Sequence, residues 1–245
     1  MRHIFSILVI LSAFCVRAET YTVLVYHGAN PPYNFLADNK QSGIFKDLFQ
    51  RLGELTGHTF ELVPWSVAKG QKLFDEGKID IEPGVHPSWR SHRLVPGIYT
   101  NAYAFSTEVI LGRRSDVVVT NPTQLYGKVI GRVRGYRYGD FEQHFGQEKI
   151  LIYDNISEKE LLSQLHYERV DFVMLGDTTA DYYKSTVKAY QTFKEVYEIS
   201  TLPVYIRLQP NLTLLQKQLN KALTQMREHD EIAVIYARYG ATLKH

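Results

Sequence analysis

The hydrophobic positions in the first part of the chain alternate between two periods. A run of β-branched and aromatic residues over 21–26 leads into a loop with glycine and proline, which is typical of a strand. Apolar residues then recur at helical spacing from Phe45 to Leu55, and Gly57 follows as a stop signal. The same patterns predict a strand over 60–65, a helix over 68–76 and a short strand over 79–81. Strands that alternate with helices in this way are expected to pair in parallel.

The alternation stops and then starts again. A β-rich stretch is predicted over 99–111, followed by strands over 128–133, 150–153 and 170–175 and helices over 138–145 and 157–166. The chain closes with a predicted strand over 203–208 and two amphipathic helices over 212–228 and 231–239. These patterns predict two α/β units. No low-complexity linker separates them, so they are expected to lie close together.

The N-terminus has the pattern of a secretory signal peptide. Basic residues precede an apolar run, and small residues at Val16 and Ala18 fit a signal-peptidase site, which predicts a cleaved segment over 1–18. The apolar run is shorter than the roughly 20 residues that a membrane-spanning helix needs. The residue before Cys15 is large, whereas a lipoprotein signal needs a small one there. The mature protein is therefore expected in the periplasm, soluble and without a lipid anchor.

Composition excludes several classes of function. The chain has 28 Lys and Arg against 26 Asp and Glu, and the predicted signal peptide carries Arg2 and Arg17, so the mature chain is expected to be neutral. Neutrality gives no reason to expect a nucleic acid or an anionic membrane as partner. Cys15 is the only cysteine, so the mature protein is expected to have no disulfide, no thiol nucleophile and no thiolate metal ligand.

Several segments, in this order, resemble family 3 of the bacterial extracellular solute-binding proteins, which serve ABC transporters for polar amino acids. The resemblance covers the whole mature chain. It rests on PPYNF at 31–35, GIFKDL at 43–48, GKID at 77–80, LYGKVIG at 125–131, RVD at 169–171, NKAL at 220–223 and IYARYG at 235–240.

The resemblance implies an α/β fold, a two-lobed periplasmic-binding-protein clamshell in which each lobe is a mixed sheet flanked by helices. Lobe I would comprise 19–110 and 200–245, and lobe II would be the inserted segment 111–199. Two crossing strands would join the lobes near 108–113 and 195–202. The protein would be a monomer that closes on an amino-acid-like or carboxylate-bearing solute between its lobes and delivers it to the membrane permease of an ABC transporter.

Arg90 matches the arginine that receives the ligand's α-carboxylate in this family. A guanidinium group grips a carboxylate with two parallel N–H donors and stays charged at physiological pH. The alternative is a solvated loop arginine. The turn that begins at Gly84 is one residue shorter than the family pattern, and His86 or Val85 stands where many relatives have Ser or Thr, which puts the ligand class in doubt. His86 is a candidate for a pH-dependent contact with the ligand.

Two aromatic residues are candidates for the walls of the pocket. Tyr33 lies in the Pro-rich loop and Trp65 ends a predicted strand, where the family commonly places aromatic side chains. An aromatic face covers the apolar part of a ligand and attracts an ammonium or guanidinium group. Packing within lobe I is the alternative for both.

The segment Gly135, Tyr136 and Arg137 follows a predicted strand and opens a predicted helix. Such a loop directs backbone N–H groups at an anion, although its glycine spacing does not match a dinucleotide fingerprint. If Arg137 faces the cleft beside Arg90, the site favours a solute with two anionic groups. A basic loop that faces solvent is the alternative.

Asp177 follows the predicted strand over 170–175, near the aspartate that pairs with the ligand's α-ammonium in the family. The register puts Gly176 at that position, so Asp177 serves only if the loop takes up one extra residue.

Catalysis and metal binding have less support. The fold also resembles that of periplasmic cyclohexadienyl dehydratases, for which Glu82, His86 and Asp177 are the possible general acids. No nucleophile elbow or zinc-binding helix is present, and His86 and His92 have no compact third ligand. The sequence predicts no enzyme, no cofactor and no metal, and it leaves open a sensory module that signals to a membrane partner.

Overall fold

The computed structural model describes residues 18–26, 30–35, 42–113 and 118–244. The predicted signal peptide, except for Ala18, lies outside these residues. Within the described ranges, no helix combines the length and the apolar character needed to cross a bilayer.

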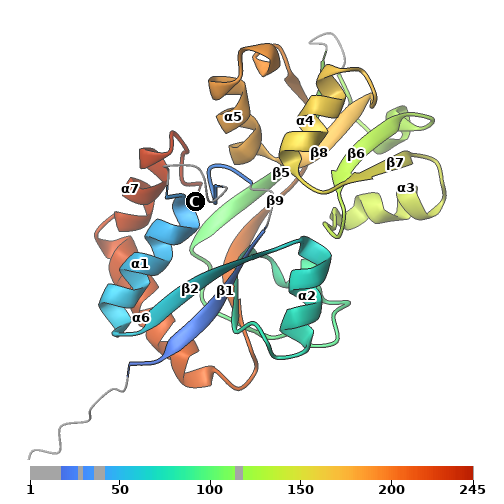
Figure 1. Cartoon of the computed structure of the whole chain (residues 1–245). Helices are drawn as coiled ribbons and strands as arrows, with labels where there is room; N and C mark the ends of the chain where they lie inside the picture. Colours follow the sequence, from blue (N-terminus) through green and yellow to red (C-terminus); the bar gives the residue numbers. More distant parts are fainter. Residues whose placement is uncertain (1–17, 27–29, 36–41, 114–117, 245) are drawn as a thin grey trace, which may run out of the picture.

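The described strands form one curled, mixed sheet (Figure 1). They are β1 (Thr20–Tyr26), β2 (Thr59–Trp65), β3 (Ile81–Val85), β4 (Ile98–Tyr99), β5 (Ala104–Gly112), β6 (Val129–Val133), β7 (Leu151–Asn155), β8 (Phe172–Gly176) and β9 (Lys194–Leu208). Their order is β2-β1-β3-β9-β5-β8-β6-β7, with β4 also on β9. The pairs β1–β2, β1–β3, β6–β7 and β6–β8 are parallel, as the alternation of strands and helices predicted.

Two groups of elements lie on either side of the centre of this sheet (Figure 1). The first half contains β1 to β4 with α1 (Ile44–Thr56), α2 (Val67–Asp75), α6 (Thr213–Glu228) and α7 (Glu231–Arg238). The second half contains β6 to β8 with α3 (Glu142–Gly146), α4 (Glu158–His166) and α5 (Asp177–Thr186). The long strands β5 and β9 join the halves, and they pair antiparallel from Ala104 opposite Val204 to Gly112 opposite Lys194.

Each half has its own hydrophobic core. In the first half, Leu52 of α1 and Leu219 of α6 are fully buried in one cluster that also includes Ile81 of β3. In the second half, Leu161 of α4 packs in a cluster with Val173 of β8. Full burial of one such side chain contributes about 1.5–3 kcal/mol, so the amphipathic faces seen in the sequence hold the helices on the sheet.

The structure differs from the sequence predictions at several elements. The helix expected over 138–145 is a 3-10 turn (Gly139–Phe141) followed by the short α3, because Gly139 adopts a positive φ of 53° that interrupts a regular helix. Strand β9 begins at Lys194 and is much longer than the predicted 203–208. Its first part shifts register against β5, and its burial does not follow the simple alternation by which a strand is predicted from sequence. The short strand expected over 79–81 is Ile81–Val85 instead.

Candidate functional site

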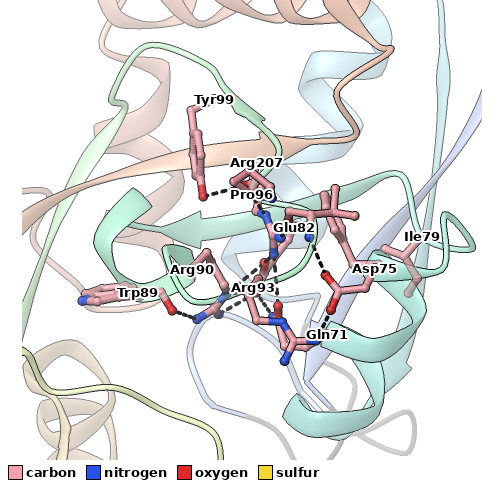
Figure 2. A network of polar contacts seen from close by, with 12 residues as sticks. Gln71, Asp75, Ile79, Glu82, Trp89, Arg90, Arg93, Pro96, Tyr99 and Arg207 are labelled. Carbon is pink, nitrogen blue, oxygen red and sulfur yellow. Dashed lines mark hydrogen bonds and ion pairs between the residues drawn. The ribbon is translucent and has the colours of Figure 1, made fainter. Parts of the chain in front are cut away.

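Three charged side chains from distant parts of the chain meet inside the first half. Glu82 lies on β3, Arg90 ends the 3-10 turn Pro87–Arg90, and Arg207 lies on β9. Oε1 of Glu82 is 2.6 Å from Nη2 of Arg90, and Oε2 of Glu82 is 2.8 Å from Nη1 of Arg207 (Figure 2). All three residues are buried. One carboxylate thus faces two guanidinium groups, which leaves this cluster with an excess of positive charge.

Neutral partners complete the cluster around Glu82. The hydroxyl group of Tyr26 donates to Oε1 of Glu82 at 2.6 Å, and the amide of Gln71 donates to the same oxygen. Burial alone would raise the pKa of Glu82, but the charges and hydrogen bonds of Arg90 and the charge of Arg207 outweigh it and lower this pKa to about 2. Glu82 is therefore ionised at every physiological pH, which excludes it as a general acid.

Most N–H groups of Arg90 are already used. Nε donates to both oxygens of Glu82 at 3.1 Å, and Nη2 donates to Glu82 and to the hydroxyl group of Tyr26. Nη1 donates to the backbone oxygen of Trp89 at 3.1 Å. A guanidinium group has five N–H donors, so one hydrogen on Nη1 has no acceptor among the described residues.

Arg90 lines a pocket between the two halves. The pocket contains about 750 Å³ of space not occupied by atoms, including the part open to solvent. From the first half it is lined by Tyr26, Asn30, Tyr33, Phe45, Pro83, Gly84, Val85, Trp89 and Arg90. The remaining lining residues are Tyr103, Ser106, Glu108, Tyr136, Arg137, Tyr138, Glu158, Gly176, Thr179 and Val204. Such a mixture of aromatic and polar groups, contributed by both halves, is typical of a small-molecule site.

Glu108 brings a carboxyl group to this pocket from β5. Its Oε1 accepts a hydrogen bond from the hydroxyl group of Ser106 at 3.3 Å, whereas its Oε2 is buried and has no hydrogen-bond partner among the described residues. Burial and the nearby carboxyl group of Glu158 raise the pKa of Glu108 to about 7. No basic side chain within the described ranges forms an ion pair with Glu108.

Glu158 brings a second carboxyl group to the pocket, from the first residue of α4. Only 5 % of its surface is exposed, and the hydroxyl group of Tyr136 donates to its Oε1 at 2.8 Å. Burial raises the pKa of Glu158 to about 7. Glu158 also has no basic ion-pair partner in the part of the chain that the structure describes.

The two halves are in contact beside the pocket. The rings of Tyr26 and Tyr136 lie 5.9 Å apart between centroids, one from each half. Val67, the first residue of α2, is buried in a cluster made mostly of second-half side chains. A Cβ at Gly135 would lie 2.9 Å from Cγ1 of Val67, so glycine allows this close approach.

Five of the residues proposed from the sequence line the pocket: Tyr33, Gly84, Arg90, Tyr136 and Arg137. Gly84 has a positive φ of 71°, and a Cβ there would lie 2.9 Å from Cζ of Phe45, so glycine is required both for the turn and for the close packing. Arg137 pairs with Glu142 at 2.7 Å, and 46 % of its side chain is exposed. Its charge is therefore already partly compensated.

The other four proposed residues are not among the described residues that line the pocket. Trp65 is 41 % exposed at the end of β2. His86 caps the turn before Arg90, where its Nδ1 accepts from the backbone of Ser88, and burial lowers its pKa. Gly135 packs on α2.

Asp177 is engaged at the start of α5. Its Oδ1 accepts from the backbone N–H of Thr178 at 2.6 Å, and its Oδ2 pairs with Nζ of Lys244 near the C-terminus. Gly176, the position that the register favoured for an ammonium partner, does line the pocket. The carboxyl groups that line the pocket are instead those of Glu108 and Glu158.

Sequence reasoning did not select Glu108 or Glu158 as site residues. Glu108 is a charged residue within the predicted β-rich stretch over 99–111, beside the apolar run 109–111, and this mismatch was the available signal. Glu158 looked like an ordinary first-turn residue of a predicted helix. Within the described ranges, no group of three His, Cys, Asp or Glu side chains is placed to hold a metal ion.

The geometry can be compared with known structures. A histidine kinase sensor domain similar to periplasmic binding proteins matches with a TM-score of 0.78 and 16% identity, covering 92% of this chain and 98% of the other. An ancestral arginine-binding protein bound to arginine has a TM-score of 0.75 and 22% identity, over 90% and 97% of the two chains. The ancestral amino acid-binding protein AncCDT-1, a precursor of cyclohexadienyl dehydratase, has a TM-score of 0.72 and 18% identity, over 90% and 94%. At these identities the likeness establishes a shared fold.

The sequence itself gives the family. No curated protein sequence matches the chain. The family model for bacterial extracellular solute-binding proteins, family 3, matches residues 23–242, which is nearly the whole chain and includes both halves of the fold. This chain therefore belongs to family 3 of the bacterial extracellular solute-binding proteins.

Proposed function

We propose that this protein captures a small amino-acid-like solute outside the cytoplasmic membrane, in the pocket between its two halves. The observation that carries the proposal is that one pocket of about 750 Å³ is lined by residues from both halves. A solute that contacts both halves at once stabilises the arrangement in which they touch. We therefore propose that ligand binding favours the closed arrangement.

We propose Arg90 as the contact for a carboxylate of the solute. Its remaining Nη1 hydrogen has no acceptor among the described residues, and its cluster contains two guanidinium groups for one carboxylate. A charge-assisted hydrogen bond of this kind is stronger than a neutral one. Tyr33 and Tyr136 line the same pocket and are proposed as its aromatic walls.

We propose that the protein is a monomer in the periplasm and delivers the captured solute to the permease of an ABC transporter. A sensor partner is the second candidate, because a histidine kinase sensor domain shares this fold. Co-purification of this protein from detergent-solubilised membranes distinguishes the two, because it would bring down a permease in the first case and a sensor kinase in the second.

The test of solute binding is a thermal-shift screen of the mature protein against amino acids, dicarboxylates and short peptides. A ligand at 100 times its dissociation constant adds about 2.7 kcal/mol to the free energy of unfolding, which raises the melting temperature by several degrees. Incubation with prephenate and arogenate in the same series tests for dehydratase activity, and turnover would replace binding with catalysis as the function.

A variant that fills the pocket tests whether a solute found in the screen binds there. Gly176 has an ordinary φ of −69°, and a Cβ there would meet only Oε1 of Glu108, at 3.9 Å. Gly176→Leu is therefore expected to fold and to abolish the shift with any ligand found. Gly146→Leu is the matched control, because a Cβ at Gly146 meets nothing within 4 Å and this residue does not line the pocket. If Gly176→Leu keeps the full shift, the solute binds elsewhere.

A further inference from the structure

The segment that follows α7 runs from the first half to the second. Leu243 packs against the hydrophobic core of the first half, and Lys244 comes next in the chain. Nζ of Lys244 pairs with Oδ2 of Asp177, the first residue of α5 in the second half. The same Nζ donates to Oγ1 of Thr107 on β5 at 2.8 Å. One ammonium group of the first half thus contacts both the second half and a strand that joins the halves.

Each partner of this contact is anchored in its own half. On the side of the first half, the hydroxyl group of Tyr239 donates to Oδ2 of Asp47 on α1 at 2.9 Å. On the other side, Oδ1 of Asp177 accepts from the backbone N–H of Thr178 at 2.6 Å, and only 14% of the Asp177 side chain is exposed. An ion pair between anchored groups costs less side-chain entropy than one between two flexible groups, so this pair resists separation of the halves.

Lys244 enters an acidic neighbourhood. Burial and the charge of Asp177 raise the pKa of Glu195 on β9, whereas the charge of Lys244 opposes this rise. Lys184 of α5 acts on Glu195 in the same direction as Lys244, but it belongs to the second half and would stay there if the halves separated. Lys244 is the positive charge that the first half brings to this point, and separation would remove it from its acidic neighbours.

A ring contact joins the same helix to the first half. The rings of Phe35 and Tyr182 lie 5.6 Å apart between centroids, with an angle of 72° between their planes. Phe35 also contacts the ring of Tyr239, at 6.2 Å. Helix α5 is thus in contact with the first half through an ion pair and an aromatic pair.

We propose that Lys244, Asp177 and Thr107 form a latch that holds the two halves together and slows the opening of the pocket between them. None of these three is among the described residues that line the pocket, so the latch acts on the arrangement of the halves and not on the solute. It would lengthen the time for which a solute stays bound, whatever the chemistry of that solute. This consequence rests on the proposed function, whereas the latch itself does not.

The test measures the distance between the halves in the ligand-free mature protein by pulsed electron paramagnetic resonance. The only cysteine of the chain lies in the predicted signal peptide, so Lys69→Cys on α2 and Lys159→Cys on α4 provide two exposed labelling sites, one in each half. We expect Lys244→Gln and Asp177→Asn each to lower the ratio of closed to open molecules by about 2- to 5-fold, as for a partly exposed ion pair. Asparagine keeps an oxygen that accepts from the backbone of α5, so this variant removes the charge alone.

Lys184→Gln is the matched control, because Lys184 pairs with Asp181 at 2.8 Å within α5 and does not join the halves. Lys244→Arg should keep the wild-type ratio. Salt at about 0.5 M should lower the ratio for the wild type and have little effect on Lys244→Gln, because the charges that it screens are absent there.

The latch is overturned if Lys244→Gln and Asp177→Asn give the same distances as Lys184→Gln, or if salt acts equally on the wild type and on Lys244→Gln. Melting curves show that each variant is folded. The measurement needs no ligand, so it separates the latch from the proposed function: a screen that finds no solute would remove the proposed function and leave this result intact.

Discussion

Glu82→Gln is the substitution with the largest expected effect on stability. The wild-type carboxylate accepts hydrogen bonds from two buried arginines, one on each side, at 2.6 and 2.8 Å. A glutamine has one oxygen and one amide N–H₂ group, so one arginine would face a donor in place of an acceptor. Two buried guanidinium groups would then remain without any countercharge in the cluster.

Two arguments give the magnitude. The pKa of Glu82 falls from 4.5 to about 2 in the folded protein, and about 1.4 kcal/mol per pKa unit gives about 3 kcal/mol. Removal of one partner from a buried ion pair costs about 3–5 kcal/mol in other proteins. We therefore expect Glu82→Gln to lower the free energy of unfolding by about 3–5 kcal/mol, and the melting temperature by about 6–20 °C.

The assay is urea unfolding of the ligand-free protein at pH 7. Glu54→Gln is the control, because Glu54 pairs with Arg51 at 3.0 Å but its side chain is 51% exposed, and such a pair contributes less than about 1 kcal/mol. The pH dependence follows from the lowered pKa: the stabilisation by Glu82 is complete above about pH 4.5 and is lost as the pH falls through about 2. The reasoning would be refuted if Glu82→Gln lowered the free energy of unfolding at pH 7 by no more than Glu54→Gln does. It would also be refuted if the difference in this free energy between Glu82→Gln and the wild type did not shrink in acid.

Two further predictions concern the pocket. Glu158→Gln should raise the free energy of unfolding by about 1–3 kcal/mol at pH 8 and by much less at pH 4. The pKa of Glu158 is raised to about 7, so ionisation of this carboxyl group destabilises the folded protein as the pH rises from about 4.5 through 7. An equal effect at both pH values in urea unfolding would contradict this. Gly84→Ala should lower the free energy of unfolding by about 1–3 kcal/mol, since φ is 71° and a Cβ would lie 2.9 Å from Phe45. Gly146→Ala, with open space around its Cβ, should cost nothing measurable in the same thermal melts, and similar losses at both glycines would show that the packing argument is wrong.

Local pattern was a reliable guide to the elements with strong periodicity. The apolar positions from Phe45 to Leu55 predicted α1, and the two amphipathic segments near the C-terminus predicted α6 and α7. Periodicity reports the side of an element that is buried, so it works wherever one face packs on the sheet. It failed over Asp177–Thr186, where α5 buries only Thr179, Ala180 and Tyr183 and shows little contrast between its faces.

Sequence motifs identified several residues that line the pocket but not its acidic residues, Glu108 and Glu158. They selected Arg90, Tyr33 and Tyr136, which the structure brings to one cavity. They did not show that Glu82 pairs with Arg90, although these residues are close in sequence, because a carboxylate on a strand has many possible partners. They also selected Asp177, which pairs with Lys244 and is not among the residues that line the pocket.

The sequence by itself determined most of the order of the elements, the parallel pairing within each half and the family, because these depend on local periodicity and on motifs in a fixed order. Only the tertiary structure decided which charged side chains line the pocket. Glu82 meets Arg207 across 125 positions of the chain, and Glu108 and Glu158 come together from β5 and α4. Such encounters depend on how the strands and helices pack. That packing supplies Arg90 with a carboxylate and brings two other carboxyl groups to the pocket, neither of which has an ion-pair partner within the described ranges.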